Sequence, residues 1–390
     1  MSELLQTIPL GAEAAFPNAE FDARVSRLQE VLAERGLDLY ITTGPENIFY
    51  LTGQQTPGYS NFQSACVPRS GTPFLVVRGT EAFNARLNSF VEDIHAYGDG
   101  EDPGTFFAGV LEQRGLAGKR IAVDLDAWYL PVNLYRKLGS ACGELHDGSG
   151  LVERFRRVKS PLEIESMELA GKAADAGMQA GLASVRAGVT DNDVAAAVMS
   201  ASILAGSEYV GMEPFVTSGR RGGVVHTTWR RNRISQGDIL VIENAACHNR
   251  YHCALFRTVA VGEVSRLALD QYAVCLDAFE AALDTARPGA TCADVHNAAQ
   301  ATIDRAGCTE GFRKRAGYSM GISFAPDWGE GNIMSVHSSV DIELVPGMAF
   351  HLPITLREYY VHTVAVSETI LITEGGCRSL SSLPRDLVEA

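Results

Sequence analysis

Two segments that lie 101 residues apart share one sequence pattern. Residues 185–206 and 286–307 are identical at eight of 22 positions. In each copy a glycine ends one helix, a threonine (Thr190 or Thr291) caps the next, and an aspartate three residues later supports the cap. Two copies are too few for a solenoid, and the alternative is a chance similarity between helix caps. The duplication predicts a domain of two similar α+β halves with a cleft between them.

The duplicated region follows a segment with a different pattern. Up to about residue 155, apolar strand-like runs alternate with helix-like stretches, which is typical of an α/β domain. Ser160, Pro161 and Glu163 then form a capping box that begins a long alanine-rich helix. We therefore expect an α/β domain over residues 1–155 and the duplicated domain over residues 156–390. The expected strands cover residues 37–42, 74–77, 91–97 and 120–125, and the expected helices between them lie near residues 80–88 and 105–114.

Charge and composition exclude several classes of function. The 390 residues carry a formal net charge of −14, which disfavours nucleic acid or an anionic membrane as a partner. No apolar run is long enough to span a membrane, and the first residues do not resemble a secretory signal, so we expect a cytoplasmic protein. The eight cysteines form no Cys-x-x-Cys pair, and no phosphate-binding, dinucleotide-binding or zinc-helix motif occurs. These absences predict a protein without a cofactor.

Two carboxylates stand inside apolar strand-like runs. Glu243 directly follows Ile-Leu-Val-Ile, and Glu368 lies within Val-Ala-Val-Ser-Glu-Thr-Ile-Leu. An ionised group in such a place must be paired or must shift its pKa. A strand-end glutamate that reaches water is the alternative for Glu243. Because both halves present the same feature, we predict one shared polar site, to which His226 in a polar loop also belongs.

The second half adds a candidate binding wall. Tyr318 precedes Asp327, Trp328 and Glu330, and two carboxylates beside a tryptophan suit a small cation. The alternative is an acidic surface turn with a packed tryptophan. His351 and His362 lie in strand-like runs and are interpreted as structural residues.

These residues resemble the creatinase/prolidase family over nearly the whole chain. Thr217-Ser218-Gly219 followed by His226 and Gly237-Asp238 is similar to the first-half pattern, and Pro346-Gly347-Met348 to the second. The resemblance implies a pita-bread catalytic domain, which is an α+β fold, after an α/β creatinase-like N-terminal domain. It also implies a homodimer, in which Tyr59 of one subunit borders the site of the other.

The peptidases of this family bind two metal ions through five side chains. The resemblance places those positions at Glu243, Ala254, Tyr318, Pro353 and Glu368. Alanine, tyrosine and proline cannot supply the usual ligands of such ions. We therefore expect no metal. Creatinase works without metal, but its substrate-clamping glutamates correspond here to Phe256 and Pro353.

The ectoine hydrolases of the family are similar in two further runs, residues 243–253 and 326–330, but differ after Leu51-Thr52-Gly53. The resemblance implies hydrolysis of a C–N bond in a small zwitterion such as ectoine or 5-hydroxyectoine, whose protonated amidine is already electrophilic. In this hypothesis Glu243 is the nucleophile or the base toward water, His226 carries the proton to the departing nitrogen, and Glu368 pairs with the cationic ring. The expected substrate-binding residues are Tyr318, Asp327, Trp328, Glu330, His252, Tyr251, Arg220 and Tyr59. In this hypothesis His252 orients Glu243, and either Arg220 or Arg221 holds a substrate carboxylate.

Other functions remain open at this point. A creatinase-like amidinohydrolase or an Xaa-Pro dipeptidase would use the same fold. A catalytically inactive pita-bread module that binds partners is the alternative from another class.

Overall fold

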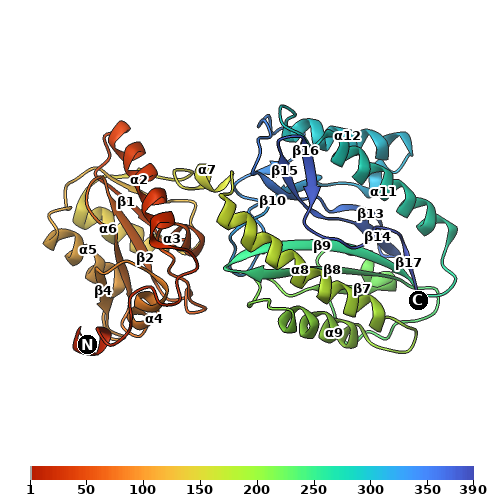
Figure 1. The fold of residues 1–390 in the computed structure, drawn as a ribbon, viewed down its shortest axis with the longest axis horizontal. Coiled ribbons are helices and arrows are strands. Elements are labelled where there is room, and N and C mark those ends of the chain that lie inside the picture. Colours follow the sequence, from red (N-terminus) through yellow and green to blue (C-terminus); the bar gives the residue numbers. More distant parts are fainter. Residues whose placement is uncertain (1) are drawn as a thin grey trace. The chain divides into compact units, whose positions relative to one another are not determined.

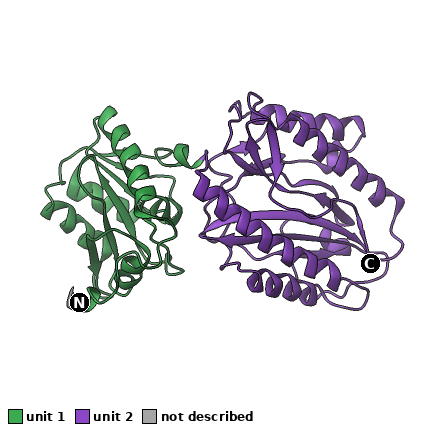
Figure 2. Ribbon diagram, in the orientation of Figure 1, with its two compact units in different colours: residues 1–156 green, residues 157–390 purple. Residues whose placement is uncertain are grey.

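The chain consists of two compact units. The computed structural model describes residues 2–390 and divides them after Arg156, one residue beyond the expected boundary (Figure 2). Within the described residues, no helix is long and apolar enough to cross a membrane.

The first unit is an α/β domain around a six-stranded sheet of order β4-β3-β2-β1-β5-β6 (Figure 1). Strand β1 pairs in parallel with β5 and antiparallel with β2. The expected strands and helices are present, but strands β2 and β6 and helices α1, α3, α6 and α7 were not expected. The elements are α1 (Ser2–Leu5), α2 (Asn18–Glu34), β1 (Leu39–Thr42), α3 (Pro45–Thr52), β2 (Ser64–Pro68), β3 (Phe74–Arg78), α4 (Glu81–Asn88), β4 (Ile94–Tyr97), α5 (Pro103–Gln113), β5 (Ile121–Val123), α6 (Val132–Cys142), β6 (Leu145–Asp147) and α7 (Glu153–Arg156).

The second unit contains both copies of the repeat, each within a helix pair that packs on strands. Its first half comprises α8 (Pro161–Ser184), α9 (Asp191–Leu204), β7 (Phe215–Ser218), α10 (Gly219–Gly222), β8 (Ile239–His248) and β9 (Tyr251–Ala260). Its second half comprises α11 (Arg266–Thr285), α12 (Cys292–Arg305), η1 (Thr309–Gly311), β10 (Gly317–Ser319), β11 (Ser335–Val336), β12 (Ala349–His351), β13 (Ile354–Glu358), β14 (His362–Val366), β15 (Thr369–Thr373), β16 (Gly376–Ser379) and β17 (Val388–Glu389).

The duplication is visible in the hydrogen bonds of the two helix starts. Thr190 and Thr291 each form a complete capping box with the aspartate three residues later. Each threonine also forms an isolated bridge to an extended segment, at Arg233 and at Glu343. The two halves are therefore structural equivalents, as the repeat predicts.

Side chains along β8 and β9 point alternately to the two faces of their sheet, and one of these faces packs against the second half of the unit. Ile242 belongs to the core that includes residues of α8 and α9, whereas Val241 and Phe256 pack against Ala365 of β14. Successive side chains of a strand point to opposite faces, so Glu243 shares the face of Val241 and Phe256. The alternation of side chains along these strands therefore directs Glu243 toward the second half.

Candidate active site

Glu243 is the carboxylate that faces the second half. It lies opposite Phe215 of β7 and Phe256 of β9. The four residues before it are buried, but Glu243 itself is partly exposed. Among the side chains of residues 4–390, none forms a hydrogen bond or an ion pair with its carboxylate. Its oxygens are therefore available to a ligand.

Two cations influence this carboxylate. Burial raises the pKa of Glu243 to about 7, and the positive charges of Lys314 and Arg357 oppose that shift. Burial and the nearby Arg357 in turn lower the pKa of Lys314 to about 7. Because Glu243 and Lys314 act on each other, their titrations belong to the pair rather than to either residue.

Aromatic rings form a wall beside Glu243. His226 stacks on Phe215 with ring centroids 5.9 Å apart, and Phe215 meets the buried Trp328 edge to face at 5.6 Å. Since Phe215 is the cross-strand neighbour of Glu243, this stack brings His226 and Trp328 to the same part of the fold. His226 has a φ of 55° and is exposed at the protein surface.

A chain of hydrogen bonds fixes Tyr318 in this wall. Trp328 donates its indole N–H to the Tyr318 hydroxyl at 2.9 Å, and that hydroxyl lies 2.9 Å from Nδ1 of His351. Nε2 of His351 is 2.6 Å from the Ser367 hydroxyl. Burial lowers the pKa of His351 to about 3, so its ring is neutral. Burial and the Glu243 carboxylate raise the pKa of Tyr318 far above its usual value, which keeps the phenol protonated.

Glu368 does not share the site with Glu243, contrary to the expectation from the sequence. Arg257 lies opposite Ile242 and therefore faces away from Glu243. Its guanidinium donates to the Glu368 carboxylate, and both side chains are almost fully buried. Ser379 donates to the other oxygen of Glu368 at 2.8 Å. The adjacent Ser367, bonded to His351, is the residue of this segment that faces the site.

Three further residues expected to bind substrate are engaged elsewhere. Glu330 forms a buried ion pair with Lys159 at 2.9 Å. The Tyr251 hydroxyl donates to Glu163 at 2.7 Å. His252 accepts the N–H of Gly211 at Nε2 and lies 3.0 Å from the Arg250 carbonyl at Nδ1, so both ring nitrogens are used. Burial lowers the pKa of His252 to about 3, in keeping with a neutral structural histidine that does not orient Glu243.

The remaining expected residues have mixed placements. Asp327 is exposed, accepts the backbone N–H groups of Trp328 and Gly329, and raises the pKa of Glu243. Arg220 is exposed on α10, with its guanidinium carbon 5.9 Å from the ring centre of Tyr360. Tyr59 belongs to the first unit, where it packs edge to face on another tyrosine, and its role in a partner's site stays a prediction.

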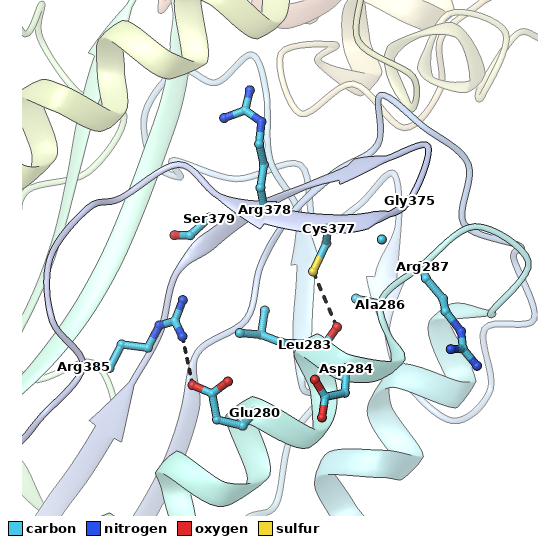
Figure 3. Close-up of a pocket in the computed structure, with 11 residues that line it drawn as sticks. Glu280, Leu283, Asp284, Ala286, Arg287, Gly375, Cys377, Arg378, Ser379 and Arg385 are labelled. Atoms are coloured by element: carbon cyan, nitrogen blue, oxygen red, sulfur yellow. Dashed lines mark hydrogen bonds and ion pairs between the residues drawn. The ribbon is translucent and has the colours of Figure 1, made fainter.

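A hollow of about 370 Å³ lies between α11 and the segment around β16 (Figure 3). Two of its arginines are already paired, Arg385 with Glu280 and Arg378 with Glu168. Its lining residues Ser379 and Arg385 also approach Glu368. This hollow therefore lies on the Arg257 side of the sheet and contains none of the residues expected from the sequence.

Sequence reasoning missed Lys314 and Arg357 and interpreted His351 as structural. Lys314 lies in the loop between η1 and β10, where no periodic pattern marks it. Arg357 alternates with Thr355 in β13, opposite Thr363 and Ala365 of β14. Arg357 could have been noticed in the sequence as a charged residue on the polar side of an otherwise apolar strand.

Comparisons with known proteins place the fold in a defined group. Residues 165–374 match the metallopeptidase family M24, and residues 24–158 match the creatinase/prolidase N-terminal domain. The ectoine hydrolase of Halomonas elongata is 29% identical over 95% of this chain and 98% of its own. A hydrolase/peptidase of Sinorhizobium fredii, y4tL, is 32% identical over 95% of this chain and 97% of its own. The crystal structure of dipeptidase PepE from Mycobacterium ulcerans has a TM-score of 0.83 at 25% identity, covering 96% of this chain and 99% of that one. The pita-bread fold with a creatinase-like N-terminal domain is thereby confirmed.

The residues present do not fit the metal centre that the family name implies. Of the five positions where the resemblance places ligands, three carry Ala254, Tyr318 and Pro353, and Glu368 is held by Arg257 on the other side of the sheet. Among the side chains that the structure describes, residues 4–390, no three or more His, Cys, Asp or Glu are grouped so that they could hold a metal ion. Lys314 and the neighbouring arginine add positive charge near Glu243, which disfavours a divalent metal ion there.

Proposed function

Because the chain belongs to metallopeptidase family M24 and carries a creatinase/prolidase N-terminal domain, we propose that it hydrolyses a C–N bond in a small zwitterion of the ectoine class without a bound metal ion. Membership of the family and the relatives that are hydrolases support hydrolysis in general. The cleavage of a non-peptide C–N bond, the substrate and the independence from metal are the proposed part.

One observation carries the proposal. At the position of a family metal ligand stands Glu243, a partly exposed carboxylate beside a wall of aromatic side chains. Among the described side chains, none forms a hydrogen bond with it. A neutral peptide carbonyl needs strong polarisation, which family peptidases obtain from metal. A protonated cyclic amidine already carries its positive charge at the carbon to be attacked. A carboxylate beside flat aromatic faces can bind and attack such a cation without further activation.

We propose one role for each of three groups. Glu243 attacks the amidinium carbon, or takes a proton from the water that does so. His226, stacked on the phenylalanine opposite Glu243, gives a proton to the departing nitrogen when the C–N bond breaks. Trp328 and the tyrosine to which it donates hold the ring flat against the wall. Addition of one water and cleavage of one ring C–N bond give an N-acetyl-2,4-diaminobutyrate product from ectoine.

Proton NMR of ectoine and 5-hydroxyectoine during incubation with the protein tests the proposal. We expect the ring methyl signal to be replaced by an acetamide signal, with turnover lost in Glu243→Gln and reduced in His226→Ala. The exposed Glu263→Gln is the matched control and should retain wild-type turnover. Hydrolysis of Xaa-Pro dipeptides with no turnover of either ectoine would overturn the proposal in favour of the dipeptidase alternative.

A further inference from the structure

We infer that Arg357 and Lys314 form a subsite for a carboxylate group of the substrate, beside Glu243. This inference rests on the proposed function, which places the cationic ring of the substrate but names no residue that binds the substrate's carboxylate. The sequence suggested Arg220 or Arg221 for the carboxylate contact, whereas this inference places the contact on residues of the second half.

Strand alternation directs Arg357 toward the site. In the β13–β14 hairpin Arg357 pairs with Thr363, and Thr355 pairs with Ala365. Residues i and i+2 share a face, so Arg357 lies on the same face as Ala365. Ala365 packs on Val241 and Phe256, which flank Glu243 in the facing sheet. The Arg357 guanidinium therefore extends along the face that opposes Glu243.

Lys314 reaches the same face from the loop before β10. Its ammonium group donates to the Thr355 hydroxyl at 3.1 Å, two residues before Arg357 on the strand. The positive charge of Arg357 contributes to lowering the pKa of Lys314, so the two cations are close enough to repel each other electrostatically.

Neither cation has an anionic partner in the protein. Among the side chains of residues 4–390, none forms an ion pair with Arg357 or Lys314, and Nε of Arg357 is buried without a hydrogen-bond acceptor. The two nearby carboxylates, Glu243 and the exposed Asp327, form no ion pair with these partly buried cations. Buried charge without a partner is costly, so a site of this kind is completed by an anion from outside the protein.

The nearby carboxylates favour a monoanion. A dianion such as phosphate would be repelled strongly by Glu243 and Asp327, whereas one carboxylate brings only a single negative charge to the two cations. The planar guanidinium matches a carboxylate with two parallel hydrogen bonds, and the lysine adds a point charge. With the cationic ring against Glu243 and the aromatic wall, the site then complements a zwitterion.

Two matched compounds test the subsite through turnover. 2-Methyl-1,4,5,6-tetrahydropyrimidine has the ring of ectoine without its carboxylate. We expect wild-type protein to prefer ectoine in kcat/KM by about 100-fold, since loss of a buried charge partner has effects of this size. Arg357→Gln should reduce this ratio to about 10-fold or less, chiefly through the rate with ectoine, and Lys314→Met should reduce it as well. The exposed Arg266→Gln should leave it unchanged. An unaltered ratio in both site variants would overturn the inference.

A thermal-stability measurement tests the carboxylate subsite without relying on hydrolysis. Sodium propionate should raise the Tm of the wild-type chain above its value in sodium chloride at equal ionic strength, because a ligand of the folded state stabilises it. The difference should vanish in Arg357→Gln and persist in Arg266→Gln. If ectoine is not hydrolysed but propionate behaves in this way, the proposed function fails and the subsite stands. If propionate and chloride act alike on the wild-type chain, the subsite is refuted.

Discussion

Replacing Glu368 or Glu243 by glutamine distinguishes the structural role of Glu368 from the proposed reactive role of Glu243. Glu368→Gln removes the negative charge that accompanies the buried Arg257. Breaking a buried ion pair by removing one partner costs about 3–5 kcal/mol. Arg257 keeps backbone carbonyl acceptors, among them those of Ser367 and Pro384, so we expect the lower end, about 3 kcal/mol.

That loss translates into a measurable shift. A change of 1 kcal/mol moves Tm by roughly 2–4 °C in a domain of this size, so Glu368→Gln should lower Tm by about 6–12 °C. Glu243→Gln breaks no hydrogen bond and should move Tm by less than about 3 °C, while turnover falls by about 10²–10⁴-fold. Differential scanning calorimetry and ectoine turnover below the melting range measure both effects. A Glu368→Gln variant with wild-type Tm and abolished turnover would refute the structural assignment and restore the shared site expected from the sequence.

Three further changes probe other parts of the account. Lys314→Met removes a cation that lowers the pKa of Glu243, so this pKa should rise above about 7. The acidic limb of the plot of kcat/KM against pH should then move to higher pH, whereas a move to lower pH would contradict the coupling of Glu243 and Lys314. Tyr318→Phe leaves the buried indole N–H of Trp328 without its acceptor, at a cost of about 1–3 kcal/mol, which urea unfolding measures; unchanged stability would be inconsistent with the hydrogen-bond chain. Thr291→Ala removes a helix cap and should cost about 1 kcal/mol in the same assay, with turnover kept; no loss would show that the capping box is dispensable.

The fold was predictable because its main signals are local. Thr190 and Thr291 mark helix starts by side-chain hydrogen bonds within three residues, so the repeat identified both halves directly. Short elements without such signals were missed. Helix α6 begins after a proline that makes no side-chain cap, and β2 is specified by its pairing with β1 and β3 rather than by its own sequence.

The site was predictable where a residue's neighbours along the chain determine its surroundings. Glu243 at the end of an apolar run was recognised in this way. Glu368 sits in an equally apolar run, but its role depends on Arg257 on another strand, 111 residues away. One step along the strand exchanges the two faces, so sequence alone did not separate Glu368 from Ser367. Arg357 and Lys314 meet through tertiary packing, which no single segment encodes.

Turnover of ectoine after removal of metal tests the central claim most directly. The protein is treated with a chelator, dialysed, analysed for metal content and followed by proton NMR. We expect less than about a tenth of a metal ion per chain together with full turnover, because the site lacks the ligands that bind such ions. Turnover that falls on chelation and returns with a divalent cation would contradict the account and assign the chain to metal-dependent hydrolysis.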